Sequence, residues 1–176
     1  RMKRMLRLFD IVRIDHFRAV HSNWAIPTQD KDARHGWWQD GPASELMEAL
    51  IDASGEPGRL LAEDLGIIPK EVVALRRRFN LPGMAVLQFG FDGNPSNPHH
   101  PDNIQSDHVV YTGTHDNNTT QGWWMSLDDE TKQRVHQMLQ PDETPTAGLM
   151  RLAKESDAAM AMFPLQDVLG LSEEAR

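Results

Sequence analysis

Short apolar runs alternate with helical patterns along this chain, and this alternation is the strongest constraint on its fold. The runs are short and rich in Val, Ile and Leu, as is typical of buried strands. Strands that alternate with helices form a parallel sheet with crossover connections, so the chain is expected to be α/β. The predicted strands cover residues 9–14, 60–62, 83–89, 109–112 and 159–163.

Helix-starting and helix-breaking residues divide the segments between these strands. Ser44 is expected to cap a helix that Gly55 ends, and Pro69 stands in the first turn of the next helix. No Gly-rich phosphate loop follows any strand, so a dinucleotide-binding fold has little support. Half of a (β/α)8 barrel fits better, although periodicity alone does not separate a barrel from an open sheet. Further helices are expected at 2–8 and, on the surface, at 128–139 and 146–157, and a loop at 21–43.

The composition is acidic and free of cysteine. The formal net charge is −8, from 26 acids and 18 Lys plus Arg, which argues against a nucleic-acid partner. The absence of cysteine excludes disulfides and thiolate chemistry. No apolar run is long enough to span a bilayer and the first residues do not form a signal peptide, so we expect a cytoplasmic protein without a membrane partner. The basic cluster at 76–78 is interpreted as a solvated helix face.

Asp15 directly follows the first predicted strand. An acid at such a place is about as often a turn or capping residue as a functional one. Arg13 lies two positions earlier, so its side chain points to the same side of the strand. A guanidinium beside a carboxylate stabilises the negative charge, as a nucleophile that attacks an anomeric carbon requires.

Glu63 follows the second predicted strand in the same way, with Asp64 next to it. One interpretation is an exposed Glu-Asp pair at a strand end. The other is a general acid and base, kept protonated by partial burial or by the charges of Asp15 and Asp64. Strand ends converge on one mouth of a barrel, so the two carboxylates could stand roughly 5–5.5 Å apart, as in retaining glycosidases.

His115 and Asp116 follow the fourth predicted strand and raise the question of a metal site. Adjacent residues on an extended segment point apart, so this pair is expected to be a poor chelate. The histidines at 99, 100 and 108 lack a chelating spacing, and the turn at Asp92 lacks the glycine and the final Glu of a calcium loop. No metal site is expected.

Five tryptophans lie within or beside predicted loops, after strand ends. Tryptophan is usually largely buried, so these side chains could fill the core. Their indole faces could equally serve as platforms for the apolar faces of sugar rings. Both interpretations stay open, with the structural one favoured for Trp24. The five residues are Trp24, Trp37, Trp38, Trp123 and Trp124.

Four phrases of this sequence resemble those of the 4-α-glucanotransferases, or amylomaltases, a family within the α-amylase clan. The resemblance runs in unbroken order from about residue 7 to residue 172. The phrases are Arg-Ile-Asp-His-Phe-Arg (13–18), Ala-Glu-Asp-Leu-Gly (62–66), Leu-Pro-Gly-Met-Ala-Val-Leu-Gln-Phe-Gly-Phe-Asp (81–92) and Tyr-Thr-Gly-Thr-His-Asp-Asn (111–117).

The resemblance implies an enzyme that moves α-1,4-glucan segments between maltooligosaccharides by a retaining double displacement, without cofactor or metal. It also implies that residues 1–176 are the C-terminal part of a (β/α)8 catalytic domain, roughly strands four to eight, which needs the missing N-terminal part and is inactive alone. The implied catalytic residues are Asp15 as nucleophile, Glu63 as acid/base and Asp116, which grips the hydroxyls of the distorted sugar. The implied substrate-binding residues are Arg13, His115 and Asp92.

Two other classes stay open at this point. An α-amylase-type hydrolase would use the same three acids on the same glucans. A non-catalytic glucan-binding protein would tolerate the loss of one acid, and all three are present, which argues against that class.

Overall fold

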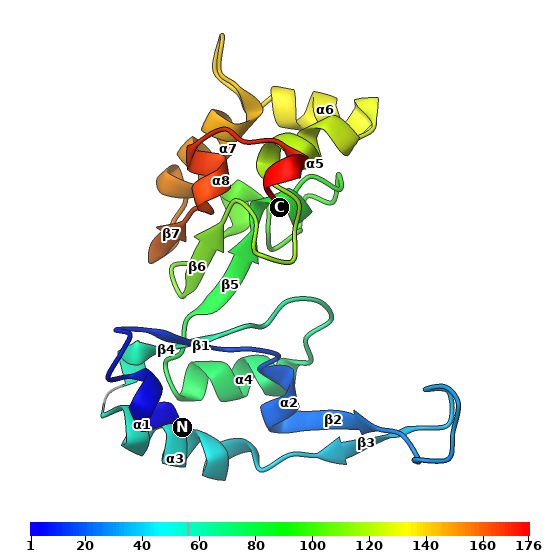
Figure 1. Cartoon of the computed structure of the whole chain (residues 1–176), viewed down its shortest axis with the longest axis vertical. Helices are drawn as coiled ribbons and strands as arrows, with labels where there is room; N and C mark the ends of the chain where they lie inside the picture. Colours follow the sequence, from blue (N-terminus) through cyan, green and yellow to red (C-terminus); the bar gives the residue numbers. More distant parts are fainter. Residues whose placement is uncertain (56) are drawn as a thin grey trace. The chain divides into compact units, whose positions relative to one another are not determined.

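The computed structural model describes residues 1–55 and 57–176, which form two compact units, 1–83 and 84–176 (Figure 1). Each unit contains parallel strands and helices, which confirms the predicted α/β class. No helix within the described ranges is long and apolar enough to cross a membrane.

The first unit is built around two short parallel strands, β1 (Val12–Ile14) and β4 (Leu60–Ala62). All three residues of β4 are buried, whereas those of β1 are half-buried. The chain between Met2 and Arg78 covers this pair with helices α1 (Met2–Met5), α2 (Arg18–His21), α3 (Ala43–Ser54) and α4 (Lys70–Arg78) and with the 3-10 turn Pro57–Arg59.

One hydrophobic core joins these helices to β4. Phe17 and Met47 are fully buried in it, and α4 contributes Val72 and Leu75. The predicted end of α3 is confirmed, because Gly55 adopts a left-handed backbone with φ of 84°. The predicted start is off by two residues, since α3 begins at Ala43 rather than after Ser44 and no side chain caps it.

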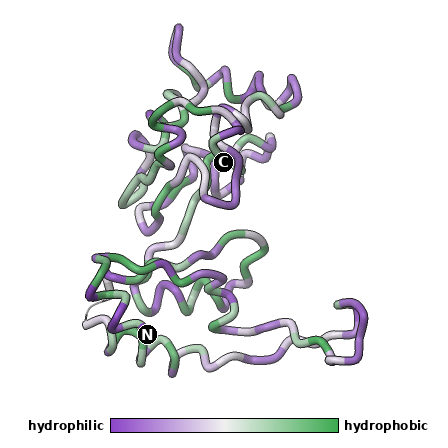
Figure 2. The backbone as a smooth tube through the Cα atoms, in the orientation of Figure 1, coloured by the Kyte–Doolittle hydropathy of each residue, from purple (hydrophilic) through white to green (hydrophobic). Residues whose placement is uncertain are grey.

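An antiparallel ribbon projects from the first unit, formed by β2 (Ser22–Ala25) and β3 (Trp37–Asp40) (Figure 1). The loop that joins the two strands is hydrophilic (Figure 2). The prediction of a loop over 21–43 is therefore wrong for these two strands. All four residues of β3 are exposed, so no alternation of buried and exposed side chains marks it in the sequence.

The second unit contains a three-stranded sheet in the order β5 (Gly83–Val86), β6 (His108–Tyr111) and β7 (Met160–Met162). Strands β6 and β7 are parallel, with Val110 opposite Ala161. The helices of this unit are α5 (Thr120–Ser126), α6 (Asp129–His136), α7 (Pro145–Glu155) and α8 (Leu165–Val168), with 3-10 turns at Leu87–Phe89, Pro101–Asn103 and Glu173–Ala175.

Each of the five predicted strands is present, and two of the expected details are wrong. The strand expected over 83–89 ends at Val86 and continues as a 3-10 turn. Helix α7, expected on the surface, buries Leu149, Leu152 and Ala153 in the core of the second unit. Within the described residues, the five strands form a pair and a triplet rather than one continuous sheet.

Candidate active site

Asp15 and Glu63 stand at the same end of two paired parallel strands. Ile14 of β1 lies opposite Ala62 of β4, so the acids are the next residue on each strand. The Glu63 amide donates to the Ile14 carbonyl at 2.9 Å, and the Phe17 amide donates to the Glu63 carbonyl at 2.9 Å. Neighbouring strands lie about 4.8 Å apart, so this register places the two acids at adjacent strand ends.

The Glu63 carboxylate is held by backbone amides on both of its oxygens. The His16 amide donates to Oε2 at 2.7 Å, and the Leu65 amide donates to Oε1 at 3.0 Å. His16 directly follows Asp15 and has a left-handed backbone with φ of 47°, in the turn that ends β1. The turn after Asp15 therefore fixes the position of the Glu63 carboxylate.

Asp15 forms an ion pair with Arg13, as expected from their spacing on β1. Arg13 Nη2 donates to Asp15 Oδ1, and the Arg13 side chain is largely buried whereas that of Asp15 is 76% exposed. An exposed carboxylate beside a fixed guanidinium is accessible to a ligand while its charge is stabilised. This pair and Glu63 form a candidate site at the end of the β1–β4 layer.

Asp64, next to Glu63, points into the first unit and pairs with Arg76 of α4. Arg76 Nε lies 3.0 Å from Asp64 Oδ2, with side-chain exposures of 2% and 8%. Gly83 makes room for the pair, since a Cβ there would lie 2.6 Å from Asp64 Oδ2.

This buried pair corrects two of our expectations. The cluster 76–78 is not uniformly a solvated helix face, because Arg76 is buried while Arg78 is 62% exposed. The interpretation of residues 63 and 64 as an exposed Glu-Asp pair is wrong for Asp64.

His115 and Asp116 lie in the loop after β6, in the second unit. Both side chains are exposed, and His115 Nε2 lies 3.4 Å from Asp116 Oδ2. The segment is a turn rather than extended, so the expectation that the two side chains point apart is wrong. Asn117 shapes the turn, because its Oδ1 accepts from the amide and hydroxyl of Thr114 at 2.9 and 2.8 Å.

Asp92 lies in the turn after the 3-10 segment 87–89, also in the second unit. A side-chain hydrogen bond with Asn97 and the Asn94 amide, 2.9 Å from Oδ1, hold the pKa of Asp92 below its ordinary value. This exposed acid is therefore ionised in the turn. Its bonds lie within its own loop.

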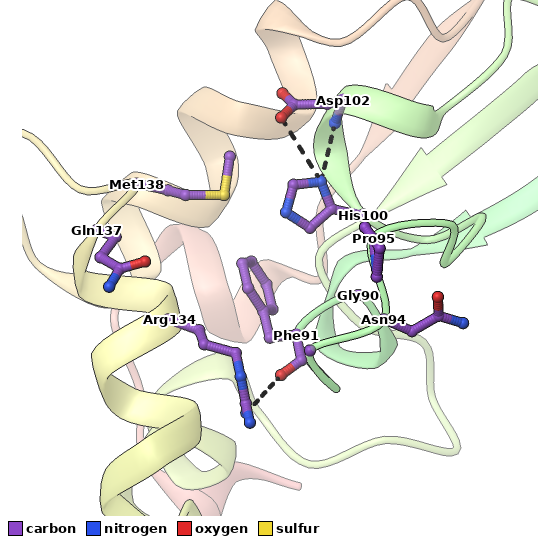
Figure 3. A pocket seen from close by; sticks show the side chains of 10 residues that line it. Gly90, Phe91, Asn94, Pro95, His100, Asp102, Arg134, Gln137 and Met138 are labelled. Atoms are coloured by element: carbon purple, nitrogen blue, oxygen red, sulfur yellow. Dashed lines mark hydrogen bonds and ion pairs between the residues drawn. The ribbon is translucent and has the colours of Figure 1, made fainter.

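A pocket of about 340 Å³ opens beside the same turn (Figure 3). Two of its charged side chains are already paired: Arg134 donates to the Phe91 carbonyl at 3.2 Å and forms an ion pair with Glu130 outside the pocket, and His100 Nδ1 lies 3.7 Å from Asp102 Oδ2. Within residues 1–55 and 57–176, no group of three His, Asp or Glu side chains is arranged to hold a metal ion. The pocket is lined by Gly90, Phe91, Gly93, Asn94, Pro95, His100, Asp102, Arg134, Gln137 and Met138.

The tryptophans fall into two groups with different surroundings. Trp123 and Trp124 lie on α5, partly buried against the core of the second unit, which favours the structural interpretation for this pair. Trp24, Trp37 and Trp38 lie on the ribbon and are 40% to 52% exposed. The Trp24 ring meets the edge of Trp38 at 5.3 Å between centroids, and the Arg18 guanidinium lies 4.0 Å from the centre of the Trp38 ring. The ribbon therefore exposes parts of three indoles, and Arg18 covers one face of Trp38.

Comparisons with known proteins agree with the resemblance seen in the sequence. The 4-alpha-glucanotransferase of Synechocystis sp. is 47% identical over 179 residues, which cover 100% of this chain and 35% of the relative. The chloroplastic/amyloplastic 4-alpha-glucanotransferase of Solanum tuberosum is 46% identical over 178 residues, covering 100% of this chain and 31% of the relative.

A solved amylomaltase from Streptococcus agalactiae, in complex with acarbose, has a similar structure. Its TM-score is 0.91 at 29% identity, over 99% of this chain and 36% of that chain. The chain thus spans about a third of the length of these relatives. A family model described as 4-alpha-glucanotransferase matches residues 1–176, so the chain belongs to the 4-alpha-glucanotransferase family.

Proposed function

We propose that residues 1–176 carry the catalytic carboxylates of an enzyme that moves α-1,4-glucan segments between maltooligosaccharides. Asp15 is the nucleophile and Glu63 the acid/base, Asp116 holds the hydroxyls of the distorted sugar, and Arg13, His115 and Asp92 bind substrate. The observation that carries this proposal is the placement of Asp15 and Glu63 at the ends of paired parallel strands. Acids at the ends of neighbouring strands lie close enough for their side chains to reach the separation of roughly 5–5.5 Å between carboxyl groups that a retaining displacement needs.

The reaction has two displacements at the same carbon. Glu63 protonates the glycosidic oxygen while Asp15 attacks the anomeric carbon, which gives a β-linked glycosyl-enzyme and releases the leaving segment. Glu63 then takes the proton from the 4-hydroxyl of an acceptor sugar, which attacks the same carbon and restores the α linkage. The amides of His16 and Leu65 each use one lone pair of a Glu63 oxygen, so the remaining lone pairs are free to exchange the proton.

The same proposal assigns the chain to roughly strands four to eight of a (β/α)8 barrel, in the C-terminal part of the catalytic domain. Within the first unit the Pro82 carbonyl accepts from the Ala62 amide at 2.9 Å, so β4 is hydrogen-bonded to β1 on one side and to Pro82 on the other. A strand that is bonded on both sides is what a closed barrel requires. Because the chain spans about a third of its relatives, we expect it to be inactive without the rest of the enzyme.

Covalent trapping in the full-length enzyme tests the roles of the two acids. Asp15→Asn should abolish adduct formation with an activated glucosyl fluoride and lower turnover at least about a thousandfold. Glu63→Gln should still form the adduct, because fluoride leaves without a proton, and the adduct should accumulate. Asp52→Asn and Glu71→Gln, exposed acids on α3 and α4, are matched controls that should keep full activity. Adduct formation by Asp15→Asn would show that the nucleophile is another residue.

A time course with maltotriose distinguishes transfer from hydrolysis by the same carboxylates. Longer oligomers together with glucose, at a constant number of reducing ends, are expected for transfer. A net gain of reducing ends would assign the site to a hydrolase instead. Acarbose, bound in the Streptococcus agalactiae amylomaltase, is the first ligand to test as an inhibitor.

A further inference from the structure

A buried carboxylate lies behind the loop that carries His115 and Asp116. Asp167 of α8 is 2% exposed, and its partners Thr112 and Thr120 are fully buried. The Thr112 and Thr120 hydroxyls donate to Asp167 Oδ2 at 2.5 and 2.7 Å, and the Thr120 amide donates to Oδ1 at 2.7 Å. A buried acid with three donors is a fixed point within the second unit.

The two threonines mark the two ends of that loop. Thr112 directly follows β6, and Thr120 is the first residue of α5. Residues 113–119 between them contain the exposed pair His115 and Asp116. Asp167 therefore joins the start and the end of the loop to a single carboxylate that comes from a distant part of the chain.

Other contacts hold the same loop from within and from the side. Gln88 Nε2 donates to the Asn118 carbonyl at 3.0 Å, and a Cβ at Gly113 would lie 2.6 Å from that nitrogen. The Thr119 hydroxyl accepts from the Gly122 amide at 3.1 Å and so fixes the start of α5. With both ends fixed, few backbone positions are left for Asp116.

We propose that Asp167 is a positioning residue for the transfer reaction, acting through Thr112 and Thr120 to fix the loop that presents His115 and Asp116. The inference rests on the proposed function, in which Asp116 holds the distorted sugar. A carboxylate that binds the substrate mainly in its distorted form contributes to turnover more than to ground-state binding. A shift of about 1 Å in such a group can lower the rate a hundredfold. Loss of the hydrogen bonds to Asp167 should therefore lower kcat and leave KM nearly unchanged.

Removal of one hydroxyl in the full-length enzyme tests this role. Thr120→Val keeps the shape of the side chain but deletes its bond to Asp167, and Thr120→Ser keeps the hydroxyl. The matched control is Thr146→Val, because the buried Thr146 hydroxyl has no hydrogen-bond partner within the described part of the chain. Turnover of maltotriose is measured at least about 10 °C below the Tm of each variant, so that unfolded protein does not contribute.

We expect Thr120→Val to lower kcat about tenfold or more with KM within about twofold of the parent. Thr120→Ser should restore most of the rate, and Thr146→Val should leave kcat and KM unchanged. Asp167→Asn should lose less activity than Asp167→Ala, because the Asn carbonyl can accept the Thr120 amide and the threonine hydroxyls can turn to accept from its NH₂ group.

The outcomes separate the failure of this inference from the failure of the proposed function. If Thr120→Val and Asp167→Ala lower Tm but keep the parent kcat, Asp167 is merely structural and the inference is overturned. A single additional variant, Asp116→Asn, tests the assumption beneath it. Full turnover by Asp116→Asn would overturn the role of Asp116 in the proposed function, and the inference with it.

Discussion

The replacement of Arg76 by methionine tests whether the ion pair beneath the first unit's candidate site is as buried as its geometry indicates. Arg76 Nε lies 3.0 Å from Asp64 Oδ2, and Arg76 Nη1 donates to the Leu81 carbonyl at 2.8 Å. Methionine keeps the apolar stem but removes the charge and its donors. The substitution therefore removes the ion pair with Arg76 from Asp64, whose side chain is 8% exposed.

The loss of stability on Arg76→Met follows from the loss of the buried ion pair with Asp64. Removal of one partner of a buried ion pair destabilises a protein by about 3–5 kcal/mol, because the remaining charge has lost both its partner and its water. An exposed pair contributes only about 0–1 kcal/mol. The same helix supplies the comparison, since Arg78 pairs with Glu48 at 3.6 Å and both side chains are more than half exposed. Arg76→Met should thus cost at least three times as much as Arg78→Met.

Urea unfolding of the full-length enzyme, combined with hydrogen exchange of peptides from residues 60–83, measures this difference. In an enzyme about three times as long as this chain, 1 kcal/mol corresponds to about 1 °C in Tm, so Arg76→Met should lower Tm by roughly 3–5 °C. Exchange should accelerate in β4 and α4. The double variant Asp64→Leu/Arg76→Met should recover most of the loss, because no charge is left buried. Equal small effects of Arg76→Met and Arg78→Met would refute the reasoning.

Two further predictions concern stability against pH and the exposed indoles. The Arg151 guanidinium lowers the pKa of Glu143 below its ordinary value of 4.5, so the pair stabilises the fold above that value and loses this contribution as pH falls through the folded pKa. Glu143→Gln should therefore lower Tm at pH 7 and reduce the fall of Tm below about pH 5. Glu155→Gln removes the more exposed partner of Arg151 and should change the dependence of Tm on pH little. Trp37→Ala should raise the apparent KM for an acceptor sugar with little change in Tm, whereas Trp123→Ala should lower Tm. The reverse pattern would contradict our assignment of the ribbon tryptophans to sugar binding and of the α5 tryptophans to the core.

The elements that could be predicted are those whose signal is local. Buried runs such as Leu60–Ala62 are predicted as strands because they are short and all of their residues are apolar. The end of β5 could not be placed, because Leu87 and Gln88 remain buried after the backbone turns into a 3-10 segment. The β2–β3 ribbon was missed for the opposite reason, since its Trp-rich second strand is exposed on both faces.

The proximity of Asp15 and Glu63 was predictable, because parallel strands end at one edge of a sheet. Their detailed setting was not predictable from the sequence. The His16 amide donates to the Glu63 carboxylate across two strands that pair 48 positions apart in the sequence, and no local pattern at His16 indicates this bond or its left-handed backbone. The turn that brings His115 and Asp116 together likewise depends on Asn117, whose role no spacing rule indicates.

The burial of Asp64 and Asp167 could not be predicted from the sequence. In both units these buried acids lie directly behind the proposed catalytic segments. Asp64 follows Glu63 and is paired with Arg76, and Asp167 ties down both ends of the loop that carries Asp116. Apolar contacts are non-directional and fix a backbone only loosely, whereas a buried carboxylate with several donors is costly to displace in any direction. Such acids resemble surface acids in a sequence, because only the fold brings their partners to them. We therefore expect these buried acids and their partners to fix the positions of the proposed catalytic carboxylates more tightly than apolar packing alone would.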